Sequence, residues 1–280
     1  MYIAEGYPLP KETIGCEKYI YVKKGMLAQR ALNYEQVTTE YLLMLDDDLK
    51  LPDDAAETML KLLEEYSADA ISPDIFTNSS RPLLSEIMMT VSGRMRPRRN
   101  DAIWGYKVML NAGYSYNKNP KNKVYQSQTN AGACLLCRKE DFLKLKLSEE
   151  LWVDKTKYPL GEDQVMYYKM YLNGYKLLTY YNHNIEHLDG GNNRSEEKEK
   201  SLIYSDFRFK TIFWHRFIFK PEKRFFVKLL SCLAILYTFT FTFLVSVIKG
   251  RLDVVKIKYD AIKDGVKFLK SDEYKELPLI

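Results

Sequence analysis

The run Tyr41-Leu42-Leu43-Met44-Leu45-Asp46-Asp47-Asp48 decides the fold and the chemistry that we expect of this chain. Consecutive apolar residues bounded by polar sequence are typical of a buried core strand. Three neighbouring carboxylates repel one another, and an N-cap role in a following helix explains only one of them. Because Mg²⁺ and Mn²⁺ bind carboxylate and phosphate oxygens, the run predicts a divalent-cation site. An acidic turn with solvated charges is the alternative.

Apolar runs alternate with helical patterns from residue 19 to residue 190, which is typical of an α/β domain. Ligands of open α/β sheets bind beyond the carboxyl ends of strands, where the three aspartates stand. Residues 77–125 have weak periodicity and predict a long irregular region. We expect strands over 19–22, 41–45, 70–72, 131–137 and 175–180, and helices over 26–34, 52–66, 139–145 and 161–173.

Composition limits the function classes. The 280 residues include 42 basic and 37 acidic ones, a net charge of +5 that does not indicate a nucleic-acid partner. The sequence contains no glycine-rich phosphate loop and no zinc-type Cys/His spacing. Cys134 and Cys137 form a CxxC motif inside an apolar strand, which favours buried structural thiols over a redox or metal-binding pair. This cysteine usage fits a reducing cytosol.

A second acidic group, Gly161-Glu162-Asp163, opens a predicted helix. Acidic residues in a first turn also suit the helix dipole, so simple capping is the alternative. His187, one of three histidines, follows at the end of a strand. A structural histidine is the alternative there.

The order of these signals resembles the inverting family 2 glycosyltransferases of GT-A fold, over residues 20–190. The matches are Leu45-Asp46-Asp47-Asp48 with the family's Asp-x-Asp motif, Gly161-Glu162-Asp163 with its Glu-Asp motif, Asn173-Gly174-Tyr175-Lys176 with the segment after that helix, His187 with a late metal-ligating histidine, and Lys24-Gly25-Met26 to Arg30-Ala31 with a Gly-x-x-x-Arg segment.

The resemblance implies a mostly parallel GT-A-like sheet flanked by helices, a nucleotide-diphosphate sugar as donor, and Mn²⁺ or Mg²⁺ as cofactor. Asp48 is the expected direct metal ligand, and His187 completes the coordination. Asp46 is expected to face the ribose or the waters on the metal. Asp47 and Arg30 are also assigned to the donor site, with Asp47 turned to the opposite side of the strand in a local hydrogen bond.

The resemblance further implies that Asp163 is the general base, which deprotonates an acceptor hydroxyl that inverts the anomeric carbon. Glu162, if ionised, raises the basicity of Asp163. Trp152 is expected to stack on an acceptor sugar, and a core aromatic is the alternative.

One departure from the family concerns the start of the chain. The family begins with a strand-helix-strand unit that binds the nucleotide base, and residues 1–40 contain no such unit. Three interpretations are left open: the sequence begins too late in the gene, the protein is natively short, or a partner subunit supplies the missing half. A non-catalytic, degenerate partner subunit is therefore the alternative function, and a nucleotidyltransferase is a weaker one.

The composition changes near residue 200, which predicts a catalytic part over 1–200 and a membrane-associated part over 201–280. Residues 229–248 are uncharged, preceded by mixed basic and aromatic residues, and long enough to cross a bilayer. A buried or in-plane helix is the alternative, and residues 252–270 predict an amphipathic helix. We therefore expect a peripheral or single-pass protein on the cytoplasmic face of a membrane. Its acceptor would be a glycan or lipid-linked saccharide of cell-surface polysaccharide synthesis.

Overall fold

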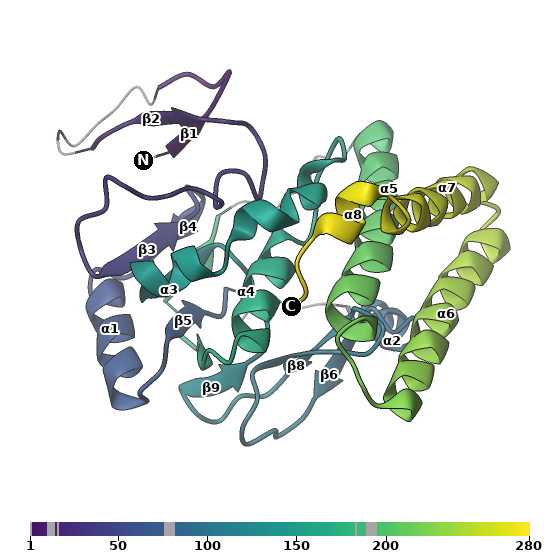
Figure 1. The fold of residues 1–280 in the computed structure, drawn as a ribbon. Helices are drawn as coiled ribbons and strands as arrows, with labels where there is room; N and C mark the ends of the chain where they lie inside the picture. Colours follow the sequence, from purple (N-terminus) through teal and green to yellow (C-terminus); the bar gives the residue numbers. More distant parts are fainter. Residues whose placement is uncertain (1, 10–14, 16, 76–81, 183, 189–194) are drawn as a thin grey trace.

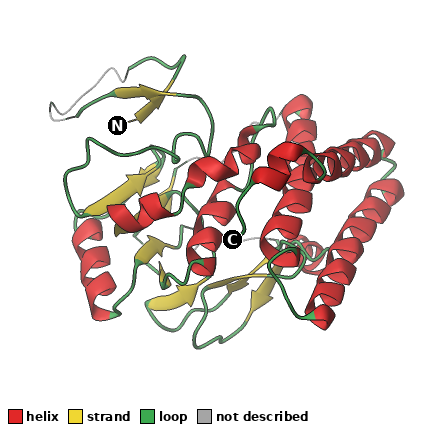
Figure 2. Cartoon of the chain, viewed as in Figure 1, coloured by secondary structure: helices red, strands yellow, loops and turns green. Residues whose placement is uncertain are grey.

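The chain is a mixed α/β protein in the computed structural model (Figure 1). The structure describes residues 2–9, 15, 17–75, 82–182, 184–188 and 195–280. The strands gather on one side of the molecule and the long C-terminal helices on the other (Figure 2). The α/β class expected from the sequence is confirmed at this level.

The central sheet has five strands in the order β3-β10-β5-β11-β9. Only β5 and β11 pair in parallel, and the other three neighbouring pairs are antiparallel, so the prediction of a mostly parallel sheet is wrong. Two strands run against the others: β10 inserts between β3 and β5 in the opposite direction, and β9 pairs antiparallel with β11 at the sheet edge. The strands are β3 (Tyr41–Leu45), β5 (Ala70–Pro73), β9 (Val124–Ser127), β10 (Cys134–Arg138) and β11 (Leu177–Tyr180).

Hydrophobic clusters cover both faces of this sheet, which explains why β10 reads as an unbroken apolar run. Cys134 belongs to the cluster on one face and Cys137 to the cluster on the other. Both thiols are free and buried, and burial raises the pKa of each to about 12. The prediction of buried structural thiols is confirmed.

The helices around the sheet are α1 (Ala55–Glu65), α3 (Lys139–Lys144), the 3₁₀ helix η1 (Leu147–Asp154) and α4 (Glu162–Leu172). Three of these lie within the helical ranges expected from the sequence, whereas η1 was not predicted. Two short strands, β4 (Leu49–Lys50) and β12 (Glu186–His187), form a separate antiparallel pair.

The segment expected to be irregular contains regular structure, so that prediction is wrong for its described part; residues 77–81 lie outside the described residues. Helix α2 (Leu83–Val91) is followed by a three-stranded sheet in the order β6-β8-β7. Its strands are β6 (Met95–Arg98), β7 (Tyr106–Val108) and β8 (Tyr114–Asn117). Strands of three or four largely polar residues are too short to show a periodic pattern.

The N-terminal segment forms a two-stranded parallel sheet of its own, β1 (Tyr2–Ala4) with β2 (Ile20–Val22). The helix predicted over 26–34 is wrong, since that segment forms hydrogen-bonded turns. The carboxylate of Asp154 accepts hydrogen bonds from the backbone N–H groups of Leu27 and Ala28, at 3.0 and 2.8 Å. This carboxylate at the end of η1 holds the turn in place.

The C-terminal helices are α5 (Glu196–Phe213), the π-helical η2 (Trp214–Phe219), α6 (Phe225–Ile248), α7 (Leu252–Leu269) and α8 (Asp272–Glu276). The predicted apolar and amphipathic helices correspond to α6 and α7. Phe209 and Phe213 of α5 belong to the same hydrophobic cluster as residues of β10 and α4. The composition changes at residue 200, but the hydrophobic core does not divide there.

A buried ionic network joins η1, α4 and η2. The Glu150 carboxylate, fully buried, is held by Arg216 through two hydrogen bonds of 2.6 Å each. Lys169 donates to one of its oxygens at 2.9 Å and the indole of Trp152 donates to the other at 2.8 Å. Both carboxylate oxygens of Glu150 therefore have two donors each. Burial raises the pKa of Glu150, but the combined effect of Arg216 and Lys169 is larger and lowers it. The net shift of the pKa is therefore downward.

Candidate active site

The aspartate run leaves β3 and turns at the edge of the central sheet. The Asp46 N–H donates to the carbonyl of Ala133 at 2.9 Å, which extends the β3–β10 pairing by one step. The chain then enters β4, whose pairing with β12 sets His187 opposite Leu49. As a result, His187 Nε2 lies 3.2 Å from Asp48 Oδ2. Two residues that are far apart in the sequence form one contact here.

This pair fits a divalent cation. The side chains of Asp48 and His187 are each 32% exposed, and Asp48 Oδ1 is a buried atom with no hydrogen-bond partner. Among the residues that the structure describes, no cluster of three or more His, Cys, Asp or Glu donors surrounds one point. Mg²⁺ and Mn²⁺ commonly use one or two protein ligands and complete their shell with water and substrate phosphate. The donor set suits a cation that is shared with a diphosphate.

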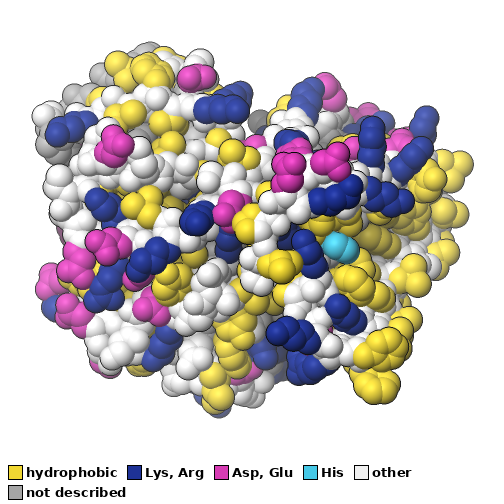
Figure 3. Space-filling model, viewed as in Figure 1, with side chains coloured by type: hydrophobic (Ala, Val, Ile, Leu, Met, Phe, Trp, Pro, Cys, Tyr) yellow, Lys and Arg dark blue, Asp and Glu magenta, His cyan; other side chains and the backbone are white. Residues whose placement is uncertain are grey.

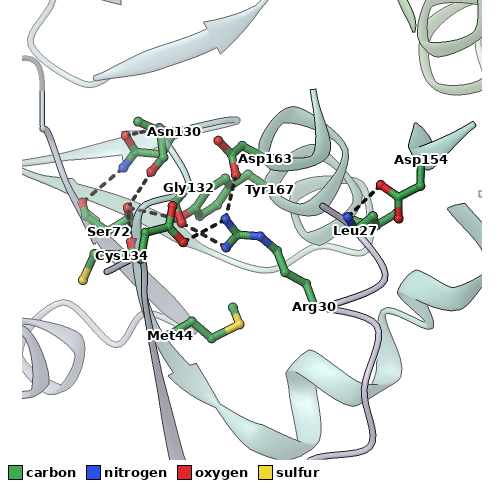
Figure 4. Close-up of polar contacts among 12 residues, drawn as sticks. Leu27, Arg30, Met44, Ser72, Asn130, Gly132, Cys134, Asp154, Asp163 and Tyr167 are labelled. Carbon is green, nitrogen blue, oxygen red and sulfur yellow. Dashed lines mark hydrogen bonds and ion pairs between the residues drawn. The ribbon is translucent and has the colours of Figure 1, made fainter. Parts of the chain in front are cut away.

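Arg30 lies between two of the predicted carboxylates (Figure 4). Its guanidinium is 3.3 Å from Asp46 Oδ1 and 3.4 Å from Asp163 Oδ1, and it donates to the carbonyl of Gly132 at 3.0 Å. The side chain is only 11% exposed. Burial lowers the pKa of Arg30, but the Asp163 and Asp46 charges outweigh it and the net shift is upward. Arg30 therefore supplies a permanent positive charge that joins the aspartate edge to α4.

Two glycines fix Asp163 at the start of α4. Gly161 precedes the helix with φ +89°, and a Cβ there would lie 2.3 Å from the ring of Phe209. A Cβ on Gly132 would overlap Asp163 Oδ1 outright. Only glycine at 132 allows β10 and its preceding loop to approach the carboxylate so closely.

Asp163 has the properties of a proton acceptor in this position. Its side chain as a whole is 32% exposed, but the Oδ1 atom itself is buried. Oδ1 makes no hydrogen bond. This oxygen has only the ion pair with Arg30, at 3.4 Å, and no hydrogen bond, so it can still accept a proton from a bound hydroxyl. The neighbouring Arg30 compensates the charge of the carboxylate.

Glu162 does not behave as the sequence suggested. It is 6% exposed, and burial together with the Asp163 charge raises the pKa of Glu162 to about 8. The carboxyl is therefore protonated at neutral pH. The expectation that an ionised Glu162 raises the basicity of Asp163 is corrected, because burial favours the neutral acid.

Trp152 is a core residue, so the prediction of an acceptor platform is wrong. The side chain is 2% exposed, and its ring stacks on Phe209 at a centroid distance of 5.9 Å. Its N–H is occupied by Glu150. The structure also places Asp47 in an exposed turn, and within the described residues it makes none of the local hydrogen bonds expected of it. Asp46 contacts Arg30 on the inner side of the same turn.

A buried polar group beneath the site was missed by the sequence reasoning (Figure 4). The Asn130 amide donates to the carbonyl of Ser72 at 3.1 Å and to Thr179 Oγ1 at 3.3 Å. The Tyr167 hydroxyl lies 3.0 Å from Ser72 Oγ and 3.2 Å from the carbonyl of Cys134. These bonds brace the loop that carries Gly132. The signal available was a polar residue, Asn130, directly before the small-residue strand.

A loop over residues 109–113 bridges α4 and α6. The side chain of Gln164, next to Asp163, donates to the carbonyl of Ala112 at 3.1 Å. Asn111 donates to Thr238 Oγ1 of α6 at 2.7 Å and to the carbonyl of Gly93 at 2.6 Å. Ala112 is buried with φ +62°, a strained conformation for a residue with a side chain. Two adjacent residues of the loop, Asn111 and Ala112, therefore contact α6 and α4 respectively.

Comparison with known proteins adds no family assignment: no protein-family model matches the chain, and no curated protein matches it.

Proposed function

We propose that this chain is a metal-dependent, inverting glycosyltransferase that moves a sugar, of the hexosyl type, from a nucleotide-diphosphate sugar to an acceptor hydroxyl. The observation that carries the proposal is the convergence of four segments, distant in the sequence, at one sheet edge. Arg30 contacts both Asp46 and Asp163, while His187 contacts Asp48. Charged groups with unpaired, buried oxygens at a sheet edge are more typical of a reaction site than of a structural cluster.

The roles follow from the positions. Asp163 would take the proton of the acceptor hydroxyl as that oxygen attacks the anomeric carbon, and the leaving diphosphate departs from the opposite face. Arg30 would fix the positions of the Asp46 and Asp163 carboxylates relative to each other. It would also face the negatively charged nucleotide-diphosphate sugar. Glu162, protonated at neutral pH, would act as a hydrogen-bonding neighbour rather than as a charge.

Asp48 and His187 would hold Mn²⁺ or Mg²⁺. When bound, such an ion neutralises the charge that develops on a leaving diphosphate. The unpaired Asp48 Oδ1 and the adjacent imidazole support this assignment. Asp46 is then a donor-site residue, since its carboxylate already contacts Arg30.

The location proposed for the reaction is the cytoplasmic face of a membrane, where nucleotide sugars are available. Within the described residues, α6 is the one helix that is long and apolar enough to cross a bilayer by length and composition. A lipid-linked saccharide or a growing cell-surface glycan is the acceptor class that suits a membrane-attached enzyme.

The test is donor turnover in membranes and in detergent, with a panel of nucleotide sugars and with Mn²⁺, Mg²⁺ or EDTA. We expect turnover that requires a divalent cation and that is lost in Asp48→Asn and Asp163→Asn. Asp53→Asn is the matched control, because Asp53 is an exposed aspartate just beyond the same turn. Turnover that does not require a metal ion, or an equal loss of turnover in the Asp53→Asn control, would refute the proposed roles.

Absence of turnover with every donor would favour the second candidate, a non-catalytic partner subunit. One observation favours that candidate: β3 is an edge strand, and no described strand of this chain pairs with its outer side. Binding of a nucleotide sugar without turnover, restored to activity by a second subunit, would identify it.

A further inference from the structure

Helix α6 is buried on one side only. Its buried residues recur every three or four positions and include four hydroxyl side chains that face the protein, Ser231, Thr238, Thr242 and Ser246. Its opposite face is apolar and open to solvent, with Phe226 76%, Leu236 61% and Ile248 83% exposed. In Figure 3 hydrophobic side chains gather along the edge of the molecule where α6 lies.

Helix α2 extends this apolar face. None of its residues is buried, and Leu83 and Leu84 are 70% and 72% exposed. The Tyr237 hydroxyl of α6 donates to the carbonyl of Val91 at 2.9 Å, and both of these residues are themselves exposed. The exposed faces of α2 and α6 therefore meet at this contact and form one surface from two helices that are far apart in the sequence.

The inner side of α6 rules out a lipid environment all round the helix. The buried Lys258 of α7 donates to the carbonyl of Thr242 at 2.7 Å and to Ser246 Oγ at 2.8 Å. The outer side of α7 exposes Asp260 and Lys263. If α6 crossed a bilayer, α7 would enter the hydrocarbon with these charges, which is energetically unfavourable.

Basic residues stand at both ends of α6. Lys223 and Arg224 precede the helix, and Lys249 and Arg251 follow it. A spanning helix would place these two groups in different headgroup layers. A helix lying in the plane of the membrane places both in the same layer, where they attract anionic headgroups.

We propose that α2 and the outer face of α6 form a membrane-docking surface that lies flat in one leaflet of an anionic bilayer, and that α6 does not cross it. The occupant of the surface is the lipid bilayer itself. The proposal concerns the mode of attachment, and its tests measure binding and depth, so they do not depend on the transferase activity.

The first test measures depth in the unaltered fold. Single cysteines at Phe226, Leu236 and Ile248, in a chain whose Cys16 and Cys232 are replaced by serine, carry an environment-sensitive dye. The full-length protein is bound to phosphatidylcholine vesicles that contain phosphatidylglycerol. We expect all three positions to be quenched by shallow spin-labelled lipids to a similar extent. A Leu236 position much deeper than both ends, or no binding to the vesicles, would overturn the proposal.

The second test asks whether α2 takes part. Leu83→Asp combined with Leu84→Asp is expected to weaken vesicle binding more than tenfold, because two charges replace apolar contacts with the acyl chains. Tyr21→Asp combined with Leu279→Asp is the control, which adds the same charge at exposed apolar positions elsewhere. Vesicle binding by the α2 variant equal to that of the control would show that α2 lies outside the interface.

Discussion

Two carboxylate groups in this molecule have opposite environments. Glu150 is fully buried, and each of its oxygens accepts two hydrogen bonds from Arg216, Lys169 or Trp152. At the sheet edge, Asp163 and Asp48 each keep one buried oxygen without a hydrogen bond. A satisfied carboxylate stabilises the fold, whereas an unsatisfied one lowers stability and is retained where it can bind or react. The contrast separates a structural cluster from a candidate reaction site, although both combine acidic and basic residues.

The largest effect expected from this contrast is on the structural side. Glu150→Ala leaves Arg216 buried without its counter-charge and Lys169 with Glu149 alone, and we expect a loss of about 3–5 kcal/mol in the free energy of unfolding. Denaturant titration followed by circular dichroism measures it. Glu149→Ala, which removes a partly exposed partner of Lys169, is expected to cost less than about 1 kcal/mol. Equal losses in the two variants would contradict the assigned role of the network.

The reaction site should show the reverse pattern. Asp163→Asn is expected to lower donor turnover by about 10²–10⁴-fold, which is the usual contribution of a general base. Its free energy of unfolding should fall by less than that of Glu150→Ala, because Asp163 is 32% exposed, its Oδ1 makes no hydrogen bond, and Arg30 keeps Asp46 as a counter-charge. A variant that loses stability and activity in parallel would mean that Asp163 is structural.

Gly132 sharpens the comparison, because it tests packing at the reaction site. Gly132→Ala places a methyl group on Asp163 Oδ1, and we expect a loss of about 1–3 kcal/mol together with a loss of turnover. Gly174→Ala is the control, since Gly174 has φ +84° but open space around it. That variant should cost about 1–2 kcal/mol through the backbone alone and leave turnover intact. Retained turnover in Gly132→Ala would show that the carboxylate can move.

A more gradual effect is expected from Glu162 and appears as a dependence of stability on pH. Its pKa is raised in the folded state from 4.5 to about 8, so the folded protein holds a proton that the unfolded chain releases between these values. Stability from this group is complete below pH 4.5 and falls as the pH rises, by up to about 1 kcal/mol per pH unit. Glu162→Gln should remove that slope in unfolding measurements at pH 5.5, 6.5 and 7.5. An unchanged slope would place the titration elsewhere.

Much of the central sheet could be predicted from the sequence, because its strands are short apolar runs that end in polar residues. The strand expected over 41–45 is β3, and the helix expected from Gly161 is α4. Strand direction could not be predicted, because an apolar run buried on both faces reads the same either way, as in β10. Helix α2 escaped detection because its apolar residues face outward and follow no core-facing period.

The candidate site was predictable in part for the same reason. Motif order identified Asp48, Asp163 and His187 as residues of one site, but nothing local in the sequence shows that β4 and β12 pair and bring His187 to Asp48. Trp152 was misassigned because an aromatic near a catalytic motif has the same sequence signature whether it faces a sugar or the core. The protonated state of Glu162 depends on burial, which the sequence does not contain.

The loop over residues 109–113 has a consequence for how the proposed enzyme would meet its acceptor. Through the adjacent residues Ala112 and Asn111, it bonds to Gln164 beside the proposed base and to Thr238 of α6. If α6 rests in a leaflet, the reacting carboxylate stands at a constant height above the phosphate plane. Acceptors diffusing laterally in that leaflet would then reach Asp163 by a two-dimensional search, and only those whose hydroxyl projects to that height would react. Acceptors would then be selected by the length of the headgroup that links the sugar to its lipid, in addition to the identity of the sugar.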